Sequence, residues 1–266
     1  MRHSLAVFLI ISLTACSSTP ETYKEDKNVT ADDLYLQARI NMRDHDYEKA
    51  IKKWESLQSR FPYGRFAQQA LIETAYASFK QGEPAPALSA ADRFLKQYPN
   101  NPHTDYVYYL KGIINFNEEL GFLSSVYTND PSEQDQVQLR DSFDAFKELV
   151  TRFPESKYAP DARVRMQYLI DTLARSELNV ATYYLRRGAY LAAINRAKFV
   201  LTEYPQSPQT RDALQIMIVA YDKMKQTVLR EDTQRVLDAS VAKDGIRPTI
   251  KIPPPSKAAW WEFWTS

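Results

Sequence analysis

The chain has little of what most enzymes and metal proteins depend on. Its 266 residues include one cysteine, six glycines and three histidines. A single cysteine leaves no partner for an internal disulfide. The histidines beyond the first 15 residues, His45 and His103, have no ligand partner three or four positions on, so no metal site is expected. A glycine-rich phosphate loop and a G-x-S-x-G nucleophile motif are also missing.

The charge balance excludes another class of protein. The full chain has 34 basic and 33 acidic residues, and removing residues 1–15 takes away only Arg2, which leaves 33 against 33. Nucleic-acid binders carry a basic excess, so a nucleic-acid partner is not expected. Few glycines together with 17 tyrosines favour a helical solenoid over a sheet protein.

The amino terminus has an apolar run, Leu5 to Leu13, that is too short to span a bilayer. A short basic start, this run and the small residues after it predict a signal peptide over residues 1–15. The following Leu-Thr-Ala-Cys resembles the bacterial lipobox, so we expect a covalent lipid on Cys16. An ordinary signal peptide with an incidental cysteine is the alternative. In lipoproteins of this type, Ser17 in place of an aspartate indicates the outer membrane.

Four predicted helices end in an aromatic residue followed by proline. Proline cannot continue a helix, and it disfavours the helical conformation of the residue before it. Small residues stand twelve positions before each proline, and apolar or small residues stand eleven, eight and five positions before it. These offsets share one helix face, where a small residue lets a neighbouring helix approach closely. The prolines are Pro62, Pro99, Pro154 and Pro205, and the small residues are Ala50, Ala87, Ser142 and Ala193.

A recurring helix of this kind is typical of the second helix of a tetratricopeptide (TPR) unit. The first helix should carry a small residue twelve positions earlier, and Ala38, Ala75 and Ala181 stand there. The third copy departs from the rule, because Asp130 is at that position and Gly112 takes the small position instead. Eighteen extra residues around Gly121 to Pro131 therefore separate the two helices of that unit. Their apolar character predicts that they pack on the body or on a partner.

The chain divides into four predicted regions after these assignments. They are the signal peptide 1–15, a lipidated flexible tether 16–29, an all-α TPR-like solenoid of about five helix pairs at 30–240, and an extended Pro/Trp-rich tail at 241–266. Thr30 should cap the first helix, with Asp32 and Asp33 in its first turn.

Three helices, instead of the usual two, are expected between Pro154 and Pro205. Pro154 and Pro205 are 51 residues apart, against 37 for Pro62 and Pro99, and the excess of 14 is about one helix. We therefore predict helices near 158–174, 176–187 and 190–203, followed by a last pair near 207–224 and 228–240. In the unit before, Leu149 should be buried between helices.

The sequence resembles the BamD family, the lipoproteins of the outer-membrane β-barrel assembly (BAM) machine, over roughly residues 16–240. The lipobox, about five TPR-like units and the long third-unit insertion support this, as do four strings: His103-Thr104-Asp105-Tyr106-Val107, Asn179-Val180-Ala181-Thr182-Tyr183-Tyr184, Arg187-Gly188-Ala189 and Asn195-Arg196. The tail after Lys243 carries no feature of the family.

The resemblance implies binding without catalysis. The implied ligands are the periplasmic POTRA region of the barrel protein BamA and signal segments of unfolded outer-membrane β-barrel proteins. Other BAM lipoproteins are implied as further partners. The chain would be held at the periplasmic face of the outer membrane by its lipid, and no cofactor is expected beyond that lipid on Cys16.

The resemblance also places a BamA contact in the strings that hold Arg187, Asn195 and Arg196. An exposed arginine there could pair with a carboxylate of the partner. The alternative is a surface arginine that pairs within its own helix.

A groove for aromatic-rich signal segments ending in a carboxylate needs aromatic faces and a cation or amide. Residues on the first helix and the turn between the first two units offer these groups, although they could also simply cap and solvate that turn. They are Tyr35, Arg39, Tyr63, Arg65, Gln68 and Gln69. Other tyrosines are expected to serve mainly in packing: Tyr106, Tyr108, Tyr109, Tyr183 and Tyr184.

Two other functions remain open at this point. One is a TPR scaffold lipoprotein for envelope polymer or peptidoglycan synthesis. The other is a peptidoglycan lyase, since Glu55-Ser56 and Glu155-Ser156 match the Glu-Ser that opens the motif of helical lytic transglycosylases. The downstream Gly-Leu-Met-Gln-type string of those enzymes is missing, so we predict no enzymatic activity.

Overall fold

The computed structural model describes residues 29–116 and 136–250, and within these ranges all regular secondary structure is helical. The helices are α2 (Ala31–Arg43), α3 (Tyr47–Arg60), α4 (Arg65–Lys80), α5 (Pro84–Gln97), α6 (Thr104–Phe116), α8 (Gln136–Arg152), α9 (Ala159–Arg186), α10 (Tyr190–Glu203), α11 (Thr210–Lys223) and α12 (Thr227–Asp244). The predicted signal peptide and most of the tether, the insertion around Gly121 to Pro131 and most of the carboxy-terminal tail lie outside the described residues.

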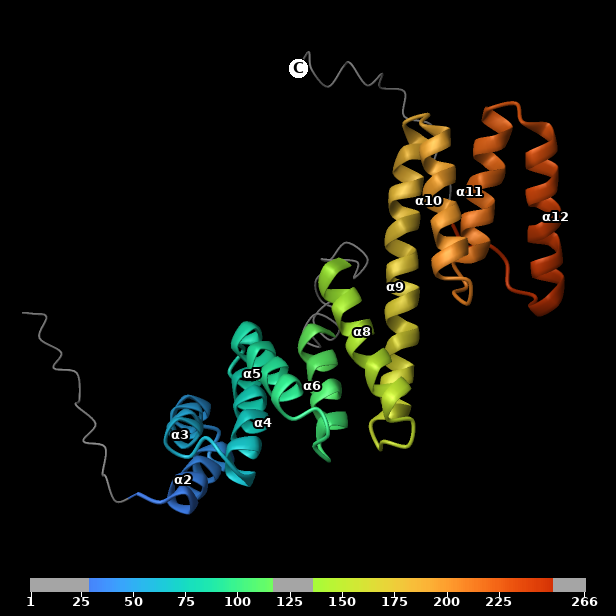
Figure 1. The fold of residues 1–266 in the computed structure, drawn as a ribbon. Coiled ribbons are helices and arrows are strands. Elements are labelled where there is room, and N and C mark those ends of the chain that lie inside the picture. The colour runs from blue at the N-terminus through green and yellow to red at the C-terminus, as the bar shows by residue number, and fades with distance from the viewer. Residues whose placement is uncertain (1–28, 117–135, 251–266) are drawn as a thin grey trace, which may run out of the picture.

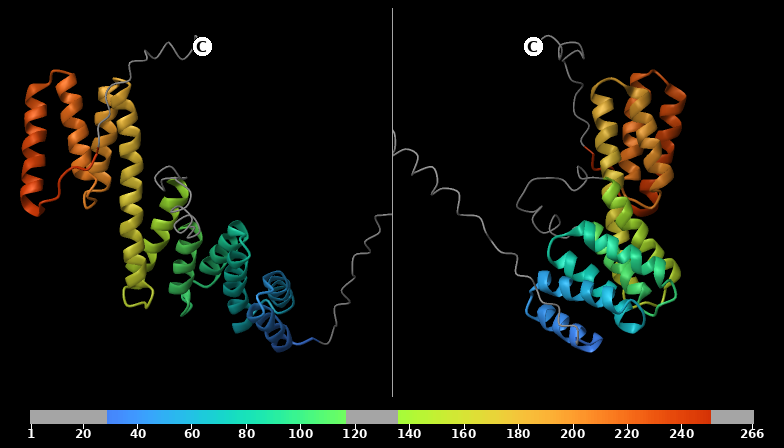
Figure 2. Two further views of the ribbon diagram at one scale, coloured as in Figure 1. Left: turned by 180° about the vertical axis from the view of Figure 1, so that it is seen from behind. Right: turned by 60° about the vertical axis from the view of Figure 1, so that its left-hand side comes forward.

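The helices stack into one extended array with α2 at one end and α12 at the other (Figure 1). Each helix packs mainly on its neighbours in sequence, and the views in Figure 2 show the same serial order. The core is therefore a row of small clusters instead of one centre, as expected for a solenoid. The clusters surround Trp54, Phe94, Phe146 and Ile216. The predicted all-α TPR-like fold is confirmed.

The aromatic-proline stops end their helices as the sequence predicts. Phe61, Tyr98 and Tyr204 are the C-caps of α3, α5 and α10, with φ between −126 and −130° and ψ between 50 and 66°. This conformation lies outside the α-helical region, which a following proline disfavours. Each cap still donates its backbone N–H to the carbonyl four residues back, at 2.8, 2.8 and 3.0 Å respectively. One last helical hydrogen bond is thus kept before the chain turns away.

The predicted face of each second helix is buried. The positions twelve, eight and five residues before each proline are all close to fully enclosed: Ala50, Trp54 and Leu57; Ala87, Ala91 and Phe94; Ser142, Phe146 and Leu149; and Ala193, Ala197 and Val200. The position eleven residues before is buried only at Ile194 and half-buried in the other copies. The prediction for Leu149, which is 0% exposed, is confirmed.

The third unit packs most tightly where Gly112 replaces the usual alanine. A Cβ built on Gly112 would lie 2.4 Å from Cε1 of Phe146, so the ring occupies the space that any side chain would need. Ser142 donates its hydroxyl to the carbonyl of Gly112 at 2.9 Å. The glycine and serine together let α6 and α8 approach across the inserted residues.

The prediction of two helices over 158–174 and 176–187 is wrong. A single helix, α9, runs unbroken for 28 residues. No glycine or proline separates the two predicted segments, and the residues at the expected break are held by neighbouring helices instead. Ser176 accepts a hydrogen bond from Gln136 of α8, and Glu177 pairs with Arg196 of α10. The amino-terminal half of α9 therefore packs on the third unit and the other half on the fourth.

The predicted boundary between solenoid and tail, at residue 240, also needs correction. Helix α12 continues to Asp244 and ends at Gly245, whose φ of 75° is the left-handed C-cap conformation that favours glycine. The chain then returns to α11, where the buried carboxylate of Asp212 accepts the backbone N–H groups of Thr249 and Ile250. Residues up to Ile250 thus belong to the folded body.

Candidate functional site

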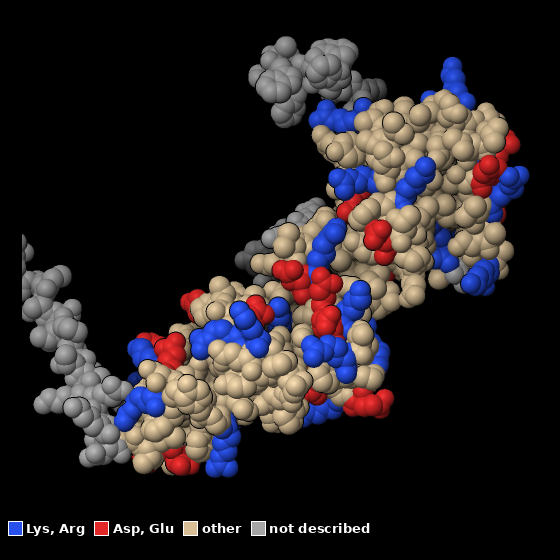
Figure 3. Space-filling view, viewed as in Figure 1, with Lys and Arg blue, Asp and Glu red and all other residues tan. Residues whose placement is uncertain are grey.

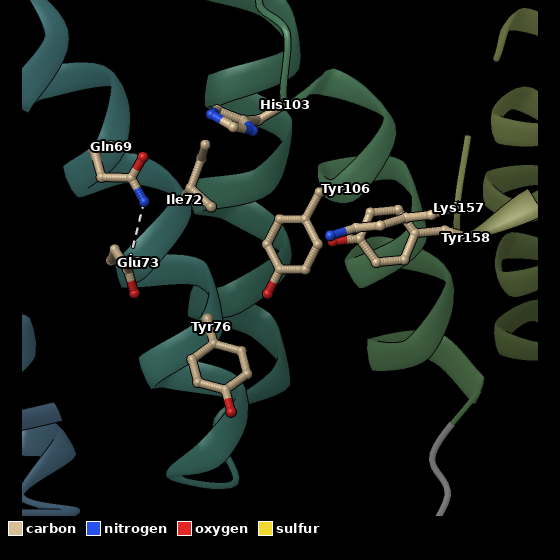
Figure 4. Close-up of a pocket in the computed structure, with 8 residues that line it drawn as sticks. All are labelled: Gln69, Ile72, Glu73, Tyr76, His103, Tyr106, Lys157 and Tyr158. Carbon is tan, nitrogen blue, oxygen red and sulfur yellow. Dashed lines mark hydrogen bonds between the residues drawn. The ribbon is translucent and has the colours of Figure 1, made fainter. Parts of the chain in front are cut away.

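A cleft of about 340 Å³ opens between α4, the start of α6 and the turn that precedes α9. Figure 4 shows its lining side chains pointing into a common space. We call it the tyrosine cleft, and its residues are Gln69, Ile72, Glu73, Tyr76, His103, Tyr106, Lys157 and Tyr158. Helices α4 and α6 and the turns before α6 and α9 supply these side chains, so their positions follow from the stacking of consecutive units.

Packed rings build one wall of the tyrosine cleft. The ring centroids of Tyr106 and Tyr158 are 5.5 Å apart, and Tyr158 stacks on Tyr109 at 4.8 Å. Burial raises the pKa of Tyr106 above its usual value, and the carboxylate of Glu73 adds to the shift. The phenol is therefore neutral at physiological pH and keeps its proton for donation to a ligand.

The opposite rim is polar and organised around Glu73. Its carboxylate accepts hydrogen bonds from Arg39 at 3.2 Å and from Gln69 at 3.0 Å. The Glu73 side chain is only 13% exposed, while that of Arg39 is 54% exposed. Two residues predicted for the peptide site, Arg39 and Gln69, are thus brought together at the edge of this cleft.

The other predicted peptide-site residues lie elsewhere. The ring of Tyr35 packs on Trp54 and Phe66, each at 5.3 Å, so Tyr35 serves the core of the first unit. Arg65 lies over the ring of Phe66 at 4.8 Å. These contacts fit the alternative of a packed and capped turn.

The remaining two predicted residues, Tyr63 and Gln68, lie at the turn between the first two units. Tyr63 is 90% exposed, which agrees with the expectation that it is free of the helix stop, but it does not line the tyrosine cleft. Gln68 accepts a hydrogen bond from Asn101 at 2.7 Å and so joins the second unit to the third.

Sequence reasoning missed most of the residues that line the cleft. Tyr106 was expected to be a packing residue, and it is indeed half-buried, but its hydroxyl end faces the cleft (Figure 4). His103 and Tyr106 both lie in a string on which the family resemblance rests, so that string was the signal available. Lys157 and Tyr158 lie 51 and 52 residues after Tyr106 in the sequence. The turn before α9 brings them to the cleft, and no local sequence pattern indicates that contact.

The carboxy-terminal candidates occupy the junction of α9 and α10. Arg187 is exposed, and its guanidinium carbon lies 5.5 Å from the ring centroid of Tyr183, which is itself 49% exposed. Asn195 is also exposed. These residues present an aromatic face, a cation and an amide to solvent.

The side chain of Arg196 is 48% exposed, and its guanidinium reaches a buried carboxylate. Its Nη1 is 3.0 Å from Oε2 of Glu177, and Nη2 of Arg140 is 3.8 Å from the other oxygen. The side chain of Glu177 is only 4% exposed. Arg196 therefore pairs with another helix, which neither of the two expectations for it foresaw.

The two Glu-Ser pairs considered for a lyase, Glu55-Ser56 and Glu155-Ser156, line none of the clefts described among the placed residues. Glu55 is exposed on α3, and Glu155 is exposed in the turn before α9. Ser156 donates its hydroxyl to Asp105 at 2.6 Å and fixes the start of the turn before α9. It has a structural role in joining the third unit to the fourth.

The described residues offer neither a metal site nor a membrane-spanning helix. No group of three or more His, Cys, Asp or Glu side chains there could hold a metal ion. Every helix in the same ranges falls short of the length and apolar character that a membrane-spanning helix requires. Cys16 lies outside these ranges.

Comparison with known proteins identifies close relatives. The family model described as "YfiO: Outer membrane lipoprotein" matches residues 27–236. The chain is 41% identical to the outer membrane protein assembly factor BamD of Neisseria meningitidis serogroup B, over 98% of both chains. It is 36% identical to the protein of the same name from Xylella fastidiosa strain Temecula1, over 90% of this chain and 82% of the relative. The Haemophilus influenzae protein is 32% identical, over 94% and 97% respectively.

Proposed function

Since this chain belongs to the BamD family of outer-membrane lipoproteins, we propose that it is a component of the machinery that folds and inserts β-barrel proteins into the outer membrane. The observation that best supports this proposal is that the chain is 41% identical, over 98% of both chains, to a protein named as an assembly factor. The relatives are assembly factors and not enzymes. A serial helical surface of this kind suits binding of several ligands at once.

The membrane attachment that we propose is a covalent lipid on Cys16, exposed after removal of residues 1–15. The tether up to residue 29 would then place the solenoid at the periplasmic face of the outer membrane. One acyl chain holds a protein only marginally, at about 0.8 kcal/mol per buried CH₂, so firm attachment needs several chains. The lipobox-like string at residues 13–16 supports this assignment.

The α9–α10 junction is the proposed docking surface for the POTRA region of BamA. Arg187 and Asn195 point to solvent there and offer donors that suit carboxylate or backbone acceptors. Arg196 contributes differently, because its pairing with Glu177 fixes the angle between the two helices. We assign Arg196 a positioning role in this docking surface.

The tyrosine cleft is the proposed site for signal segments of unfolded barrel proteins. Its ring wall suits an aromatic side chain, and the neutral phenol of Tyr106 can donate a hydrogen bond to the peptide. Lys157 and His103 lie at the rim beside this wall (Figure 4), where a terminal carboxylate would find a cation. On the opposite rim, the hydrogen bonds from Arg39 and Gln69 to Glu73 reduce the repulsion between Glu73 and a bound carboxylate.

Co-purification of a tagged, detergent-extracted chain tests the assembly role. A barrel protein with a POTRA region should co-purify, and Arg187→Glu should reduce its yield several-fold. Arg175→Glu is the matched control, since Arg175 is an exposed arginine of α9, the helix that Arg187 caps. Recovery of polymer synthases in place of a barrel protein would contradict the proposal.

A further inference from the structure

The carboxy-terminal tail carries aromatic residues that the proposed function does not use. Residues 251–266 lie beyond the described part of the chain, and the only tryptophan outside them is the fully buried Trp54. Four aromatic residues stand within five positions of the tail sequence: Trp260, Trp261, Phe263 and Trp264. Such side chains bury much apolar area when they meet a complementary surface. The end of the described chain indicates which surface of this protein is within their reach.

The last described residues turn back from α12 to α11. The left view of Figure 2 shows this segment crossing from the end of α12 to the start of α11. The buried carboxylate of Asp212 there accepts hydrogen bonds from the hydroxyl of Thr249 at 2.9 Å and from the backbone N–H of Ile250 at 3.0 Å. Ile250 also packs against the core cluster that α9, α10 and α11 share. The described chain therefore ends against these three helices.

An exposed aromatic and basic surface lies at the α9–α10 junction. Tyr183 is 49% exposed and Leu191 is 63% exposed. The guanidinium carbon of Arg187 lies 5.5 Å from the ring centroid of Tyr183. Figure 3 shows basic side chains at this end of α9 and α10. A ring and a cation beside each other form a platform on which a further aromatic ring can stack.

The tail sequence complements this platform in both charge and shape. Glu262 stands between Trp261 and Phe263, so the aromatic segment carries one carboxylate. The guanidinium of Arg187 suits a carboxylate, and the exposed ring of Tyr183 suits an indole ring. One acid among aromatic residues thus matches one cation beside an aromatic ring.

The tail is also long enough to reach the junction. The turn before α11 contacts α9 where Ser207 donates its hydroxyl to Asp171 at 2.8 Å. Tyr183 lies twelve residues further along α9, which is roughly 18 Å at 1.5 Å per residue. The ten residues 251–260 would span roughly 30 Å at the 3.1 Å per residue of an extended proline-rich segment.

We propose that the aromatic segment of residues 260–264 folds back onto the α9–α10 junction of the same chain. Its indole rings cover Tyr183 and Leu191, and its Glu262 pairs with Arg187. The contact shields the surface proposed above for the POTRA region, so the tail restrains docking of that partner. This restraint rests on the proposed function, whereas the contact itself does not.

Photocrosslinking within the full chain tests the contact. A photoreactive residue replaces Leu191, and mass spectrometry of a mixture of isotopically labelled and unlabelled chains identifies the linked peptides. Val228, which is 71% exposed on α12, is the matched control position. We expect links from position 191 to residues 257–266 of the same chain, and none to them from position 228. Links to the tail from 228 alone, from neither position, or only between two chains would overturn the proposal.

Substitutions in the platform provide a second test that leaves the tail intact. Tyr183→Ala/Arg187→Ala should shift the emission of the tail tryptophans to longer wavelength and increase its quenching by acrylamide. Val228→Ala/Arg235→Ala removes an exposed apolar residue and an exposed arginine from α12 and should change neither measurement. Equal emission and quenching in the two variants would contradict the contact.

Co-purification tests whether the tail restrains docking. Trp260→Ser/Trp261→Ser/Trp264→Ser should raise the yield of the barrel protein several-fold over that of the parent chain, because the junction is then uncovered. An unchanged yield would overturn the restraint. Absence of the barrel protein from both preparations, with the predicted crosslinks present, would contradict the proposed function and leave the contact standing.

Discussion

A buried carboxylate, Glu177, joins three helices through two half-exposed arginines. Arg196 of α10 is the closer partner, at 3.0 Å, and Arg140 of α8 lies at 3.8 Å. Removing one partner of a buried charge is costly because the other is left unpaired. At the scale of single residues, the account thus makes Arg196 a structural residue first and a neighbour of the docking surface second.

Arg196→Ala should lower the free energy of unfolding by about 1–3 kcal/mol, since Glu177 then loses its shorter charged hydrogen bond. Arg196→Glu should cost more, because a second carboxylate would face the buried one. Urea denaturation followed by circular dichroism measures both. The neighbouring exposed residue provides the control, and Asn195→Ala should change stability by less than about 0.5 kcal/mol. Wild-type stability in Arg196→Glu would refute this role.

Gly112 is the other residue whose identity the packing decides. An alanine in a helix is ordinarily more stable than glycine by about 0.5–1 kcal/mol. Here the added methyl would collide with the ring of Phe146 at 2.4 Å, so Gly112→Ala should instead destabilise by about 1–3 kcal/mol.

A double-mutant cycle checks the cause of that loss. Phe146→Leu makes a cavity but also frees the space beside Gly112. The double variant should therefore be less destabilised than the sum of the two single variants. Simple additivity would mean that the ring is not what excludes a side chain at this position.

At the scale of elements, the unbroken α9 distinguishes this array from a plain series of helix pairs. Its two halves serve different units, so the helix acts as a rigid connection between the tyrosine cleft and the α9–α10 junction. Arg175 lies exposed near the middle of α9, beside Ser176 and Glu177, which α8 and α10 hold.

Arg175→Pro should therefore destabilise the protein by about 3 kcal/mol or more, because proline removes a hydrogen bond and clashes with the preceding turn. It should also broaden the distribution of distances between the two ends of the array, as measured by small-angle scattering. Arg175→Ala removes the same side chain without the kink and should leave both measurements unchanged. Equal stability of the two variants would mean that two separate helices, and not one, meet here.

The repeat itself could be predicted from the sequence because its signal is local. Prolines, aromatic stops and small residues at fixed offsets mark one buried face, and Ala50, Ser142 and Leu149 lie where that pattern puts them. The insertion of one extra helix length was also recognised. The continuity of α9 was not, because the ties that hold its middle come from Gln136 and Arg196 on other helices.

The candidate sites were harder to predict for the same reason. Arg39 and Gln69 were identified from residue type, but Glu73, on which both converge, was not. Tyr158 reaches Tyr106 only through the stacking of the third unit on the fourth. The sequence placed Arg196 in a candidate contact surface. It could not show that Arg196 pairs with the buried Glu177 of the preceding helix.

At the scale of the whole molecule, the solenoid separates its surfaces along one axis. The tyrosine cleft belongs to the amino-terminal half, and the α9–α10 junction begins the carboxy-terminal half (Figure 1). Because the two proposed surfaces share no side chain, we propose that a substrate segment bound at one leaves the other free for a partner protein. Independent binding at two sites is the central claim of this account.

Photocrosslinking of a carboxy-terminal β-barrel peptide tests that claim most directly. A photoreactive residue would replace Tyr76, Tyr158, Tyr183 or Leu191 in turn, and the first two line the cleft while the last two are exposed near the α9–α10 junction. The account predicts labelling from positions 76 and 158, reduced about tenfold by Lys157→Glu, with none above background from 183 and 191. Labelling confined to positions 183 and 191 would contradict it.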